Sequence, residues 1–320
     1  SIGLVGSEMC IRDSKGAYQY DWTKEFTLHE TFMLNSVVHS THFNHSKFVA
    51  LRVKDAIVDQ FKKATGKRPN VDRENPDQRF LVRVTQNHVH LLRNTSGEPL
   101  YKRGYRSITG VAPLNEVLAA GILTFSDWEP TTPLIDPMCG SGTFLCEALI
   151  QAQHIAPGLL RPLFGFVKHQ SYDHKLWEKL KAEAEKAKNT IQPKLYGYDK
   201  LNKLVFATRT HLNQISPNDA KVKEANFFQL QKPVEKAMLV INPPYNVRLP
   251  QDKIHSFYND IGSRLKHYWE GCDAWILSGN LEAIKHLGLR PKRRIKLYNG
   301  PIETKLVHLP LYKGSKKQKS

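Results

Sequence analysis

Residues 132–152, TPLIDPMCGSGTFLCEALIQA, place a short apolar run, a glycine-bearing loop and an amphipathic segment in immediate succession. The apolar run ends at Asp136, and the loop contains Gly140 and Gly142. Strand, glycine loop and helix in this order are typical of the first βα unit of a nucleotide-binding sheet. The loop lacks the third glycine of a dinucleotide fingerprint and the Gly-Lys-Ser/Thr of a P-loop, which weakens the prediction of NAD or a nucleoside triphosphate as ligand.

The chain after this stretch alternates predicted helices and strands. Helices are predicted at HKLWEKLKAEAEKAKN, NKLVFATRTHLNQ and FYNDIGSRLKHYW. Strands are predicted at KLYGYD, KVKEANFFQL, KAMLVINPPY and DAWILSGN, followed by a closing pair at RRIKLYNG and TKLVHLPLYK. This alternation predicts a doubly wound α/β sheet over residues 106–313, with a basic tail at 314–320. Residues 112–125 are predicted to form a connecting helix with Pro113 in its first turn.

The preceding region predicts a second, smaller domain. Residues 47–63 carry apolar side chains at helical spacing, and two alternating runs after residue 79 predict neighbouring strands, so residues 15–105 are expected to form an α+β domain. Residues 1–14 show neither period and are set aside as a non-native leader, which implies that the natural N-terminus is missing.

Composition narrows the class of protein. The chain has 47 Lys+Arg against 30 Asp+Glu, a net charge of +17, which favours a polyanionic partner and above all a nucleic acid. No apolar run approaches the ~18 residues of a membrane span and no signal peptide is evident, so a cytoplasmic protein is predicted. The four cysteines form no CxxC pair, which argues against a disulfide framework and a cysteine zinc site.

Two carboxylates mark a candidate ligand site. Asp136 and Asp199 end the first and second predicted strands of the sheet, where ligands bind in open α/β folds. A carboxylate there can accept both hydroxyls of a ribose. Taken singly, Asp136 could equally cap a loop and Asp199 could equally cap a helix, and it is their order in the chain that favours a ligand.

The segment VINPPYNVRL, residues 240–249, predicts the target of the chemistry. Its consecutive prolines fix the backbone beside Asn242 and Tyr245. The amide oxygen of Asn242 and the carbonyl of Pro243 could accept both hydrogens of a nucleobase amino group and localise its lone pair, while Tyr245 stacks on the ring. An isolated tetrapeptide of this kind is more often a turn, but behind the glycine loop and the acid-ended second strand it predicts transfer to an exocyclic nitrogen.

These motifs resemble a known family. DPMCGSGTFLCEA, YGYD and INPPYNVRL, in that order, are similar to the S-adenosylmethionine-dependent amino-methyltransferases of the Rossmann-like class. VKDAIVDQF, RPNVDRENPD, SGEPLYKRGYR, APLNEVLAA and APGL resemble the THUMP-bearing large-subunit ribosomal RNA guanine-N2 methyltransferases, over residues 45–303. The resemblance implies a Rossmann-like methyltransferase with an N-terminally truncated THUMP domain. It implies catalytic roles for Asn242, Pro243, Pro244 and Tyr245, and binding of S-adenosylmethionine by Asp136, Met138, Gly140, Gly142, Thr143, Asp199, Asn226 and Asn242.

Two positions depart from the family pattern. Asn226 stands where relatives usually have an acid for the adenine amino group, and an amide oxygen can still accept that hydrogen bond with less charge assistance. Asn246 and Val247 follow NPPY where glycine and a polar residue are common, which puts the shape of the base pocket in doubt.

Contacts with RNA are predicted from basic and aromatic residues that alternate along the chain. For Lys102, Arg103, Tyr105 and Arg106, an interdomain linker or a strand edge is an equally good explanation. A further basic patch is Lys292, Arg293, Arg294 and Lys296. His39, His42 and His45 could suggest a metal, but no fourth ligand is evident and none is predicted. The candidate RNA-binding residues are Lys102, Arg103, Tyr105, Arg106 and Arg248.

The function predicted is transfer of a methyl group from S-adenosylmethionine to an exocyclic base nitrogen of RNA, with guanine N2 of 23S ribosomal RNA favoured. The alternatives are a tRNA guanine-N2 methyltransferase, an adenine-N6 nucleic-acid methyltransferase and a non-catalytic RNA-binding protein that retains the fold. The sequence does not indicate the oligomeric state.

Overall fold

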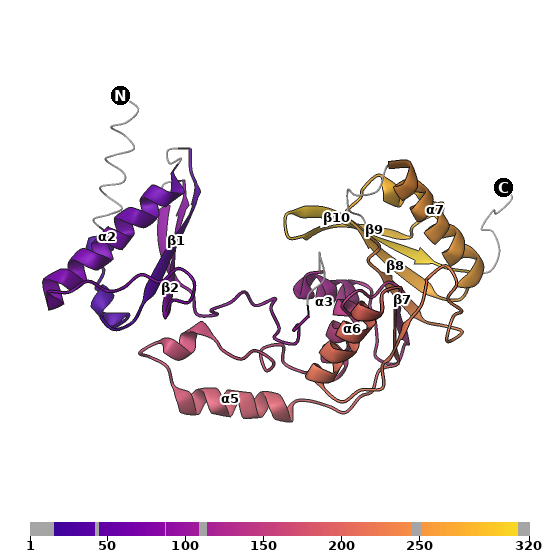
Figure 1. Ribbon diagram of the computed structural model, residues 1–320, viewed down its shortest axis with the longest axis horizontal. Helices are drawn as coiled ribbons and strands as arrows, with labels where there is room; N and C mark the ends of the chain where they lie inside the picture. Colours follow the sequence, from indigo (N-terminus) through magenta and orange to yellow (C-terminus); the bar gives the residue numbers. More distant parts are fainter. Residues whose placement is uncertain (1–15, 42–44, 87, 109–113, 245–250, 313–320) are drawn as a thin grey trace. The chain divides into compact units, whose positions relative to one another are not determined.

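A computed structural model describes residues 16–41, 45–86, 88–108, 114–244 and 251–312. The described chain divides into two compact units (Figure 1). The first contains the residues up to Leu100 together with Pro162–Lys179, and the second contains Tyr101–Arg161 and the residues from Leu180 onward. No helix in the described ranges is long and apolar enough to cross a membrane.

The first unit packs a long helix against a three-stranded sheet. Strand order is β1-β2-β3, with β1 parallel and β3 antiparallel to β2. Val53, Ile57 and Phe61 of α2 are buried at helical spacing against the inward side chains of β2. The helix ends at Thr65 and is capped by Gly66, whose φ of 75° suits glycine. The elements are η1 (Trp22–Lys24), β1 (Phe32–His39), α2 (Ser46–Thr65), β2 (Gln78–Thr85), β3 (His88–Arg93) and η2 (Gly165–Lys168).

Residues 162–179 join the first unit although they follow the glycine loop in the chain. The buried side chain of Gln78 donates from Nε2 to the carbonyl of Lys168 at 2.8 Å, and Lys168 forms an ion pair with Asp77 at 2.7 Å. Gly165 lies so close to Gly97 that a Cβ on it would meet the nitrogen of Gly97 at 2.8 Å. These contacts are long-range in sequence, and no local pattern indicated them.

The second unit is a doubly wound sheet of seven strands in the order β6-β5-β4-β7-β8-β10-β9. All pairs among β4, β5, β6, β7 and β8 are parallel, whereas β10 pairs antiparallel with β8 and with β9. The strands are β4 (Leu134–Asp136), β5 (Leu195–Asp199), β6 (Lys221–Glu224), β7 (Met238–Ile241), β8 (Asp273–Ser278), β9 (Arg293–Asn299) and β10 (Ile302–Pro310). The helices are α3 (Glu116–Phe125), α4 (Thr143–Ala152), α6 (Asn202–Ile215), α7 (Gln251–Tyr268) and η3 (Ala283–Leu287). Helix α5 (His174–Lys186) begins in the first unit and continues into the second after Lys179.

Both faces of this sheet are covered, which explains the continuous apolar runs of its central strands. Leu134 faces the core formed with α3, α4 and α6, and its neighbour Ile135 faces the core formed with α7 and η3. The structure therefore confirms the predicted Rossmann-like class (Figure 1).

Some element limits differ from the prediction. Helix α3 begins at Glu116, because the side chain of Asn115 accepts a hydrogen bond from the nitrogen of Leu118 at 3.1 Å and caps the helix there. The predicted start at 112 was wrong, and Pro113 lies outside the described residues.

Candidate active site

The site is built at the carboxyl edge of the seven-stranded sheet. Asp136 ends β4, Asp199 ends β5 and Asn242 follows β7 directly. From β4 the chain continues to β5 and β6 on one side, and it then returns to form β7 on the other side of β4. The strand order therefore reverses at β4, and open α/β sheets bind ligands at such a switch point. The structure thus brings three of the predicted residues to the ends of adjacent strands.

The glycine loop is held against the end of β5. The nitrogen of Cys139 donates to the carbonyl of Tyr198 at 2.8 Å, and the nitrogen of Gly140 donates to Oδ2 of Asp199 at 3.0 Å. The other carboxylate oxygen, Oδ1, accepts from the nitrogen of Leu201 at 2.9 Å. These two backbone donors fix the orientation of the half-buried Asp199 carboxylate, and each oxygen retains a further lone pair for a ligand.

Two glycines of the loop have positive φ for different reasons. Gly140 has φ 56°, and a Cβ on it would meet nothing within 4 Å. Gly142 has φ 83° just before α4, and a Cβ there would lie 2.5 Å from Cγ2 of Thr208. Gly140 therefore keeps space open beside the loop, whereas Gly142 lets the loop pack against α6.

Two side chains of α6 hold the loop from behind. Thr208 donates to the carbonyl of Gly140 at 2.9 Å, and Nδ1 of His211 lies 2.9 Å from the carbonyl of Ser141. Nε2 of His211 accepts from the nitrogen of Ile108 at 3.1 Å, so Nδ1 carries the proton and donates to Ser141. Burial lowers the pKa of His211, which keeps the ring neutral in this arrangement.

The sequence analysis did not single out Thr208 and His211. Both are fully buried polar residues, three positions apart on an otherwise apolar helix face. Polar side chains at helical spacing on a buried face were the available signal.

Asp136 is a buried acid, 2% exposed. Its Oδ1 accepts from the nitrogen of Met138 at 3.2 Å. Burial raises the pKa of Asp136 well above its usual range, the nearby Asp199 raises it further, and the Met138 hydrogen bond opposes both effects. A buried acceptor of this kind suits a cationic or hydroxyl-bearing ligand.

Asn242 presents a buried acceptor just after β7. Its Oδ1 is buried, and no hydrogen bond reaches it from the described residues. Pro243 behind it is buried and Pro244 is exposed, while Tyr245 and Arg248 lie outside the described residues. A buried amide oxygen without a donor loses hydrogen-bond energy unless a ligand supplies one.

Asn226, beyond the end of β6, is exposed. Its Oδ1 accepts from the nitrogen of Phe228 at 3.1 Å, which is a local turn bond. The amide oxygen has a second lone pair, so binding of the cofactor's adenine by this residue stays a prediction.

Three residues predicted to contact RNA help to hold the second unit together. Tyr105 is 1% exposed and donates to Glu147, which also pairs with Arg103 at 3.4 Å. Arg106 pairs with the buried Glu116 at 3.0 Å and donates to Oγ1 of Thr143 at 2.9 Å. A ring as buried as that of Tyr105 cannot stack on a base. Contact of Arg103 and Arg106 with RNA stays a prediction. Lys102 beside them is exposed.

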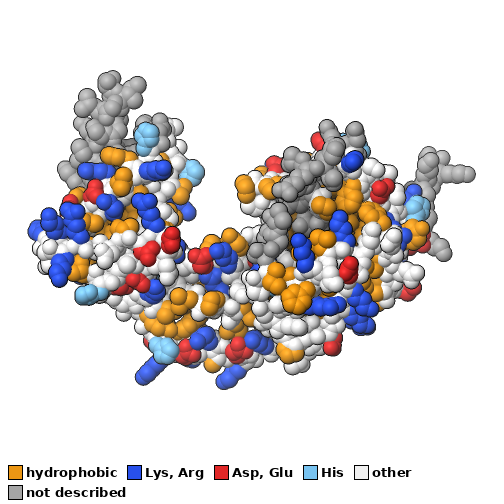
Figure 2. All heavy atoms as spheres, in the orientation of Figure 1, with side chains coloured by type: hydrophobic (Ala, Val, Ile, Leu, Met, Phe, Trp, Pro, Cys, Tyr) orange, Lys and Arg blue, Asp and Glu red, His pale blue; other side chains and the backbone are white. Residues whose placement is uncertain are grey.

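The remaining basic and histidine residues lie outside this site. His39 ends β1 and His45 precedes α2, whereas His42 lies outside the described residues. Figure 2 shows that lysine and arginine side chains are spread over both units. In the first unit, exposed side chains of β2 and β3 line an open cavity of about 310 Å³. The lining residues are Arg83, Thr85, His88, His90 and Leu92.

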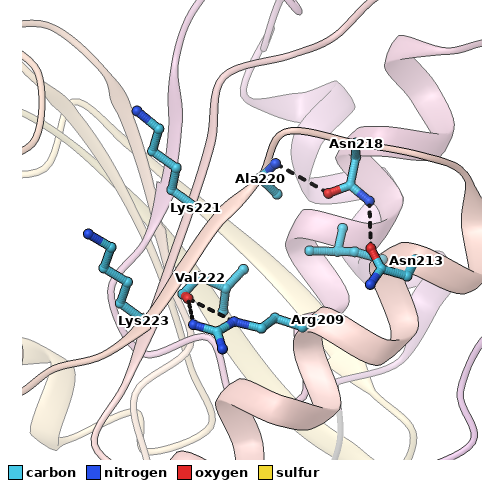
Figure 3. A pocket seen from close by; sticks show the side chains of 8 residues that line it. Arg209, Asn213, Asn218, Ala220, Lys221, Val222 and Lys223 are labelled. Carbon is cyan, nitrogen blue, oxygen red and sulfur yellow. Dashed lines mark hydrogen bonds between the residues drawn. The ribbon is translucent and has the colours of Figure 1, made fainter.

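A cavity of about 300 Å³ lies beside β6 and α6 (Figure 3). Arg209 crosses it and donates from Nε to the carbonyl of Val222 at 3.0 Å, so its guanidinium joins the edge strand to the helix. Lys221 and Lys223 project to one side of the strand in the close-up. None of the predicted cofactor residues lines this cavity.

Comparison with known proteins agrees with this geometry. The chain is 37% identical over 296 residues to "Putative RNA methyltransferase slr0064" of Synechocystis sp., covering 91% of this chain and 77% of that protein. It is 35% identical over 310 residues to the ribosomal RNA large subunit methyltransferase K/L of Psychromonas ingrahamii, covering 93% of this chain but 41% of that protein. The crystal structure of SMU.472 complexed with SAH superimposes with a TM-score of 0.81 and 26% identity, covering 96% of this chain and 81% of that one.

Two family profiles divide the chain between them. The profile of the THUMP domain matches residues 14–92, and the profile described as "RMKL-like, methyltransferase domain" matches residues 103–308. The chain belongs to the RMKL-like methyltransferase family, with a THUMP domain ahead of its methyltransferase domain.

Proposed function

We propose that this protein transfers a methyl group from S-adenosylmethionine to the exocyclic N2 of a guanine in large-subunit ribosomal RNA. The observation that carries the proposal is the buried Oδ1 of Asn242 beside the switch point of the sheet, an oxygen to which none of the described residues donates a hydrogen bond. Relatives named for large-subunit ribosomal RNA support the substrate, although the chain spans about two fifths of their length. A cytoplasmic location is part of the same proposal.

The residues at the carboxyl edge fit the proposed methyl donor. Asp199, oriented by two backbone donors, offers lone pairs to the ribose hydroxyls. Asp136 and the open space at Gly140 accommodate the amino-acid portion and the sugar. When bound, S-adenosylmethionine supplies a methyl group on a positively charged sulfur. The SAH complex of SMU.472 supports this assignment.

Asn242 and Pro243 are proposed to orient the target nitrogen. The lone pair of an aromatic amino group is delocalised into its ring, so the group is a weak nucleophile. Oδ1 of Asn242 and the carbonyl of Pro243 accept its two hydrogens, which localises the lone pair and directs it at the methyl group. Preorganised acceptors of this kind lower the barrier without a strong base. Tyr245 is proposed to stack on the base.

The first unit supports RNA as the substrate class. A THUMP domain precedes the catalytic domain, and the whole chain carries a net charge of +17. Arg83, together with the hydrogen-bonding side chains of Thr85, His88 and His90, offers phosphates a surface on that unit. An adenine-N6 activity on DNA shares the NPPY turn but gives no role to this domain.

The test uses the full chain, labelled S-adenosylmethionine and three separate acceptors: protein-free 23S ribosomal RNA, tRNA and duplex DNA. We expect N2-methylguanosine as the labelled nucleoside from the ribosomal RNA. Methyladenosine as the sole product, or labelling of tRNA alone, would contradict the assignment.

The Asn242→Ala variant tests the proposed base pocket. Loss of one preorganised acceptor should lower kcat by about 100- to 1,000-fold while binding of the methyl donor is retained. Asn213→Ala, the same change at an exposed position of α6, is the control and should keep full activity. Full activity of Asn242→Ala would exclude the pocket.

A further inference from the structure

The β9–β10 hairpin extends beyond the end of its neighbour β8. Lys305 of β10 lies opposite Ser278, the last residue of β8, yet pairing with β9 continues to Ile302 opposite Asn299. The three pairs beyond Ser278 extend the hairpin by roughly 10 Å at about 3.3 Å per residue. Because β8 is parallel to β7, this extension lies at the edge of the sheet where β7 ends and Asn242 follows.

The hairpin separates neighbouring arginines onto opposite faces. Arg293 donates to the carbonyl of Phe125 at 3.2 Å, pairs with Asp127 at 3.8 Å and lies over the ring of Trp275. Side chains alternate along a strand, so Arg294 faces the other way. The basic cluster predicted from sequence is therefore divided, and Arg293 serves as a packing residue.

The face opposite Arg293 carries Arg294, Lys296, Tyr298 and Lys305, and we call these four residues the hairpin face. Lys305 and Lys296 are directly opposed in the register, which places two positive charges side by side. Lys296 pairs with Glu303 at 2.6 Å and lies 5.4 Å from the ring centre of Tyr298. Tyr298 is 56% exposed on the edge strand of the sheet.

We propose that the hairpin face binds the RNA strand that flanks the target nucleotide, with Arg294, Lys296 and Lys305 contacting phosphates and Tyr298 stacking on a base. This inference rests on the proposed function and names the RNA surface of the catalytic domain. Strands β10 and β9 lie two and three positions from β7, about 10 and 14 Å at 4.8 Å per strand. That distance corresponds to roughly three to four nucleotides at about 3.4 Å each.

Charge and the exposed ring favour a nucleic acid strand over other partners. Three cations and a single acid, Glu303, produce a positive face, to which like-charged surfaces would not bind. Proteins that bind single-stranded nucleic acids combine aromatic side chains, on which bases stack, with cations that contact the phosphate backbone. An acidic polypeptide would satisfy the charges alone, so it becomes an outcome of the test.

The experiment compares the full chain with the triple variant Arg294→Gln, Lys296→Gln, Lys305→Gln and with the pair Tyr298→Phe and Tyr298→Ala. Dissociation constants for transcribed 23S ribosomal RNA are measured over a range of salt concentrations, together with KM and kcat for methyl transfer. The charge-matched control combines Lys221→Gln, Lys223→Gln and Lys266→Gln, at exposed positions of β6 and α7. Thermal melting and binding of S-adenosylmethionine show whether each variant is folded.

The triple variant should reduce the slope of log K against log salt by about two, since each phosphate contact on a single strand contributes about 0.7. Its KM for RNA should rise about tenfold with kcat within twofold. Tyr298→Phe should bind like the wild type and Tyr298→Ala about tenfold more weakly, because the stacking surface is lost.

An unchanged slope and KM in a folded triple variant would overturn the inference. Binding of polyglutamate, as a model acidic polypeptide, is measured in parallel. A triple variant that loses binding to polyglutamate but keeps its binding to RNA would also overturn the inference. The binding arm does not depend on chemistry. A wild type that binds RNA but transfers no methyl group would therefore refute the proposed function while the hairpin face is still tested.

Discussion

Asp136 shows how one residue can be costly for the fold and useful for the ligand. Burial, and then the charge of Asp199, raise the pKa of Asp136, so the folded protein holds a proton at pH values where the unfolded chain has lost it. The free energy of unfolding therefore falls as pH rises from the unfolded pKa towards the raised value.

Asp136→Asn should remove this pH dependence and raise the free energy of unfolding at neutral pH. A cationic ligand favours the ionised carboxylate, so the same change should weaken binding of S-adenosylmethionine by about 10- to 100-fold through loss of a charge-assisted hydrogen bond. Urea unfolding between pH 4 and 8, with calorimetric binding in parallel, measures both effects. A variant less stable than the wild type at neutral pH would contradict this account of the buried acid.

At the scale of elements, the glycine loop and α6 form one assembly. Gly142→Ala should lower the free energy of unfolding by about 2 to 4 kcal/mol, because a left-handed backbone and a contact with Thr208 both oppose the new Cβ. Gly140→Ala should cost only about 1 to 2 kcal/mol, since its Cβ enters open space.

The double variant Gly142→Ala, Thr208→Ser removes the methyl group that the new Cβ meets and keeps the hydroxyl that holds Gly140. It should recover part of the lost stability in urea unfolding. Equal costs for the two single alanine variants would mean that contact with α6 does not determine the conformation at Gly142.

Sequence patterns predicted the elements that local chemistry specifies. Glycines, strand-ending acids and apolar runs located β4, the loop, α4, β5 and β7 correctly. The same reasoning missed β1 and predicted that Tyr105 contacts RNA, because an aromatic residue among basic ones looks the same whether it faces solvent or the buried Glu147. Whether such a side chain faces solvent or a buried acid depends on residues that are distant in sequence, which a local pattern does not reveal. The roles of Asn226 and Tyr245 stay predictions.

At the scale of the whole molecule, the segment after Leu100 belongs to the catalytic unit through buried ion pairs. Arg106→Ala would leave the buried Glu116 unpaired and should lower the free energy of unfolding by about 3 to 5 kcal/mol. Adding Glu116→Gln should restore part of the loss. Tryptophan fluorescence during urea unfolding measures the free energy of unfolding of both variants. An unchanged unfolding midpoint combined with weaker RNA binding would instead return Arg106 to the RNA surface.

The return of residues 162–179 to the first unit also affects how the protein is made. Lys168 is 90 residues beyond Gln78 and 91 beyond Asp77, its two polar partners in that unit. Synthesis proceeds from the N-terminus, so the THUMP sheet leaves the ribosome well before the segment that completes it. During that interval Gln78 and Asp77 lack these partners, and the glycine loop of the catalytic unit is synthesised in between. The first unit is therefore complete only after residues 101–161 of the second unit have been translated, because residues 162–179 follow them in the chain.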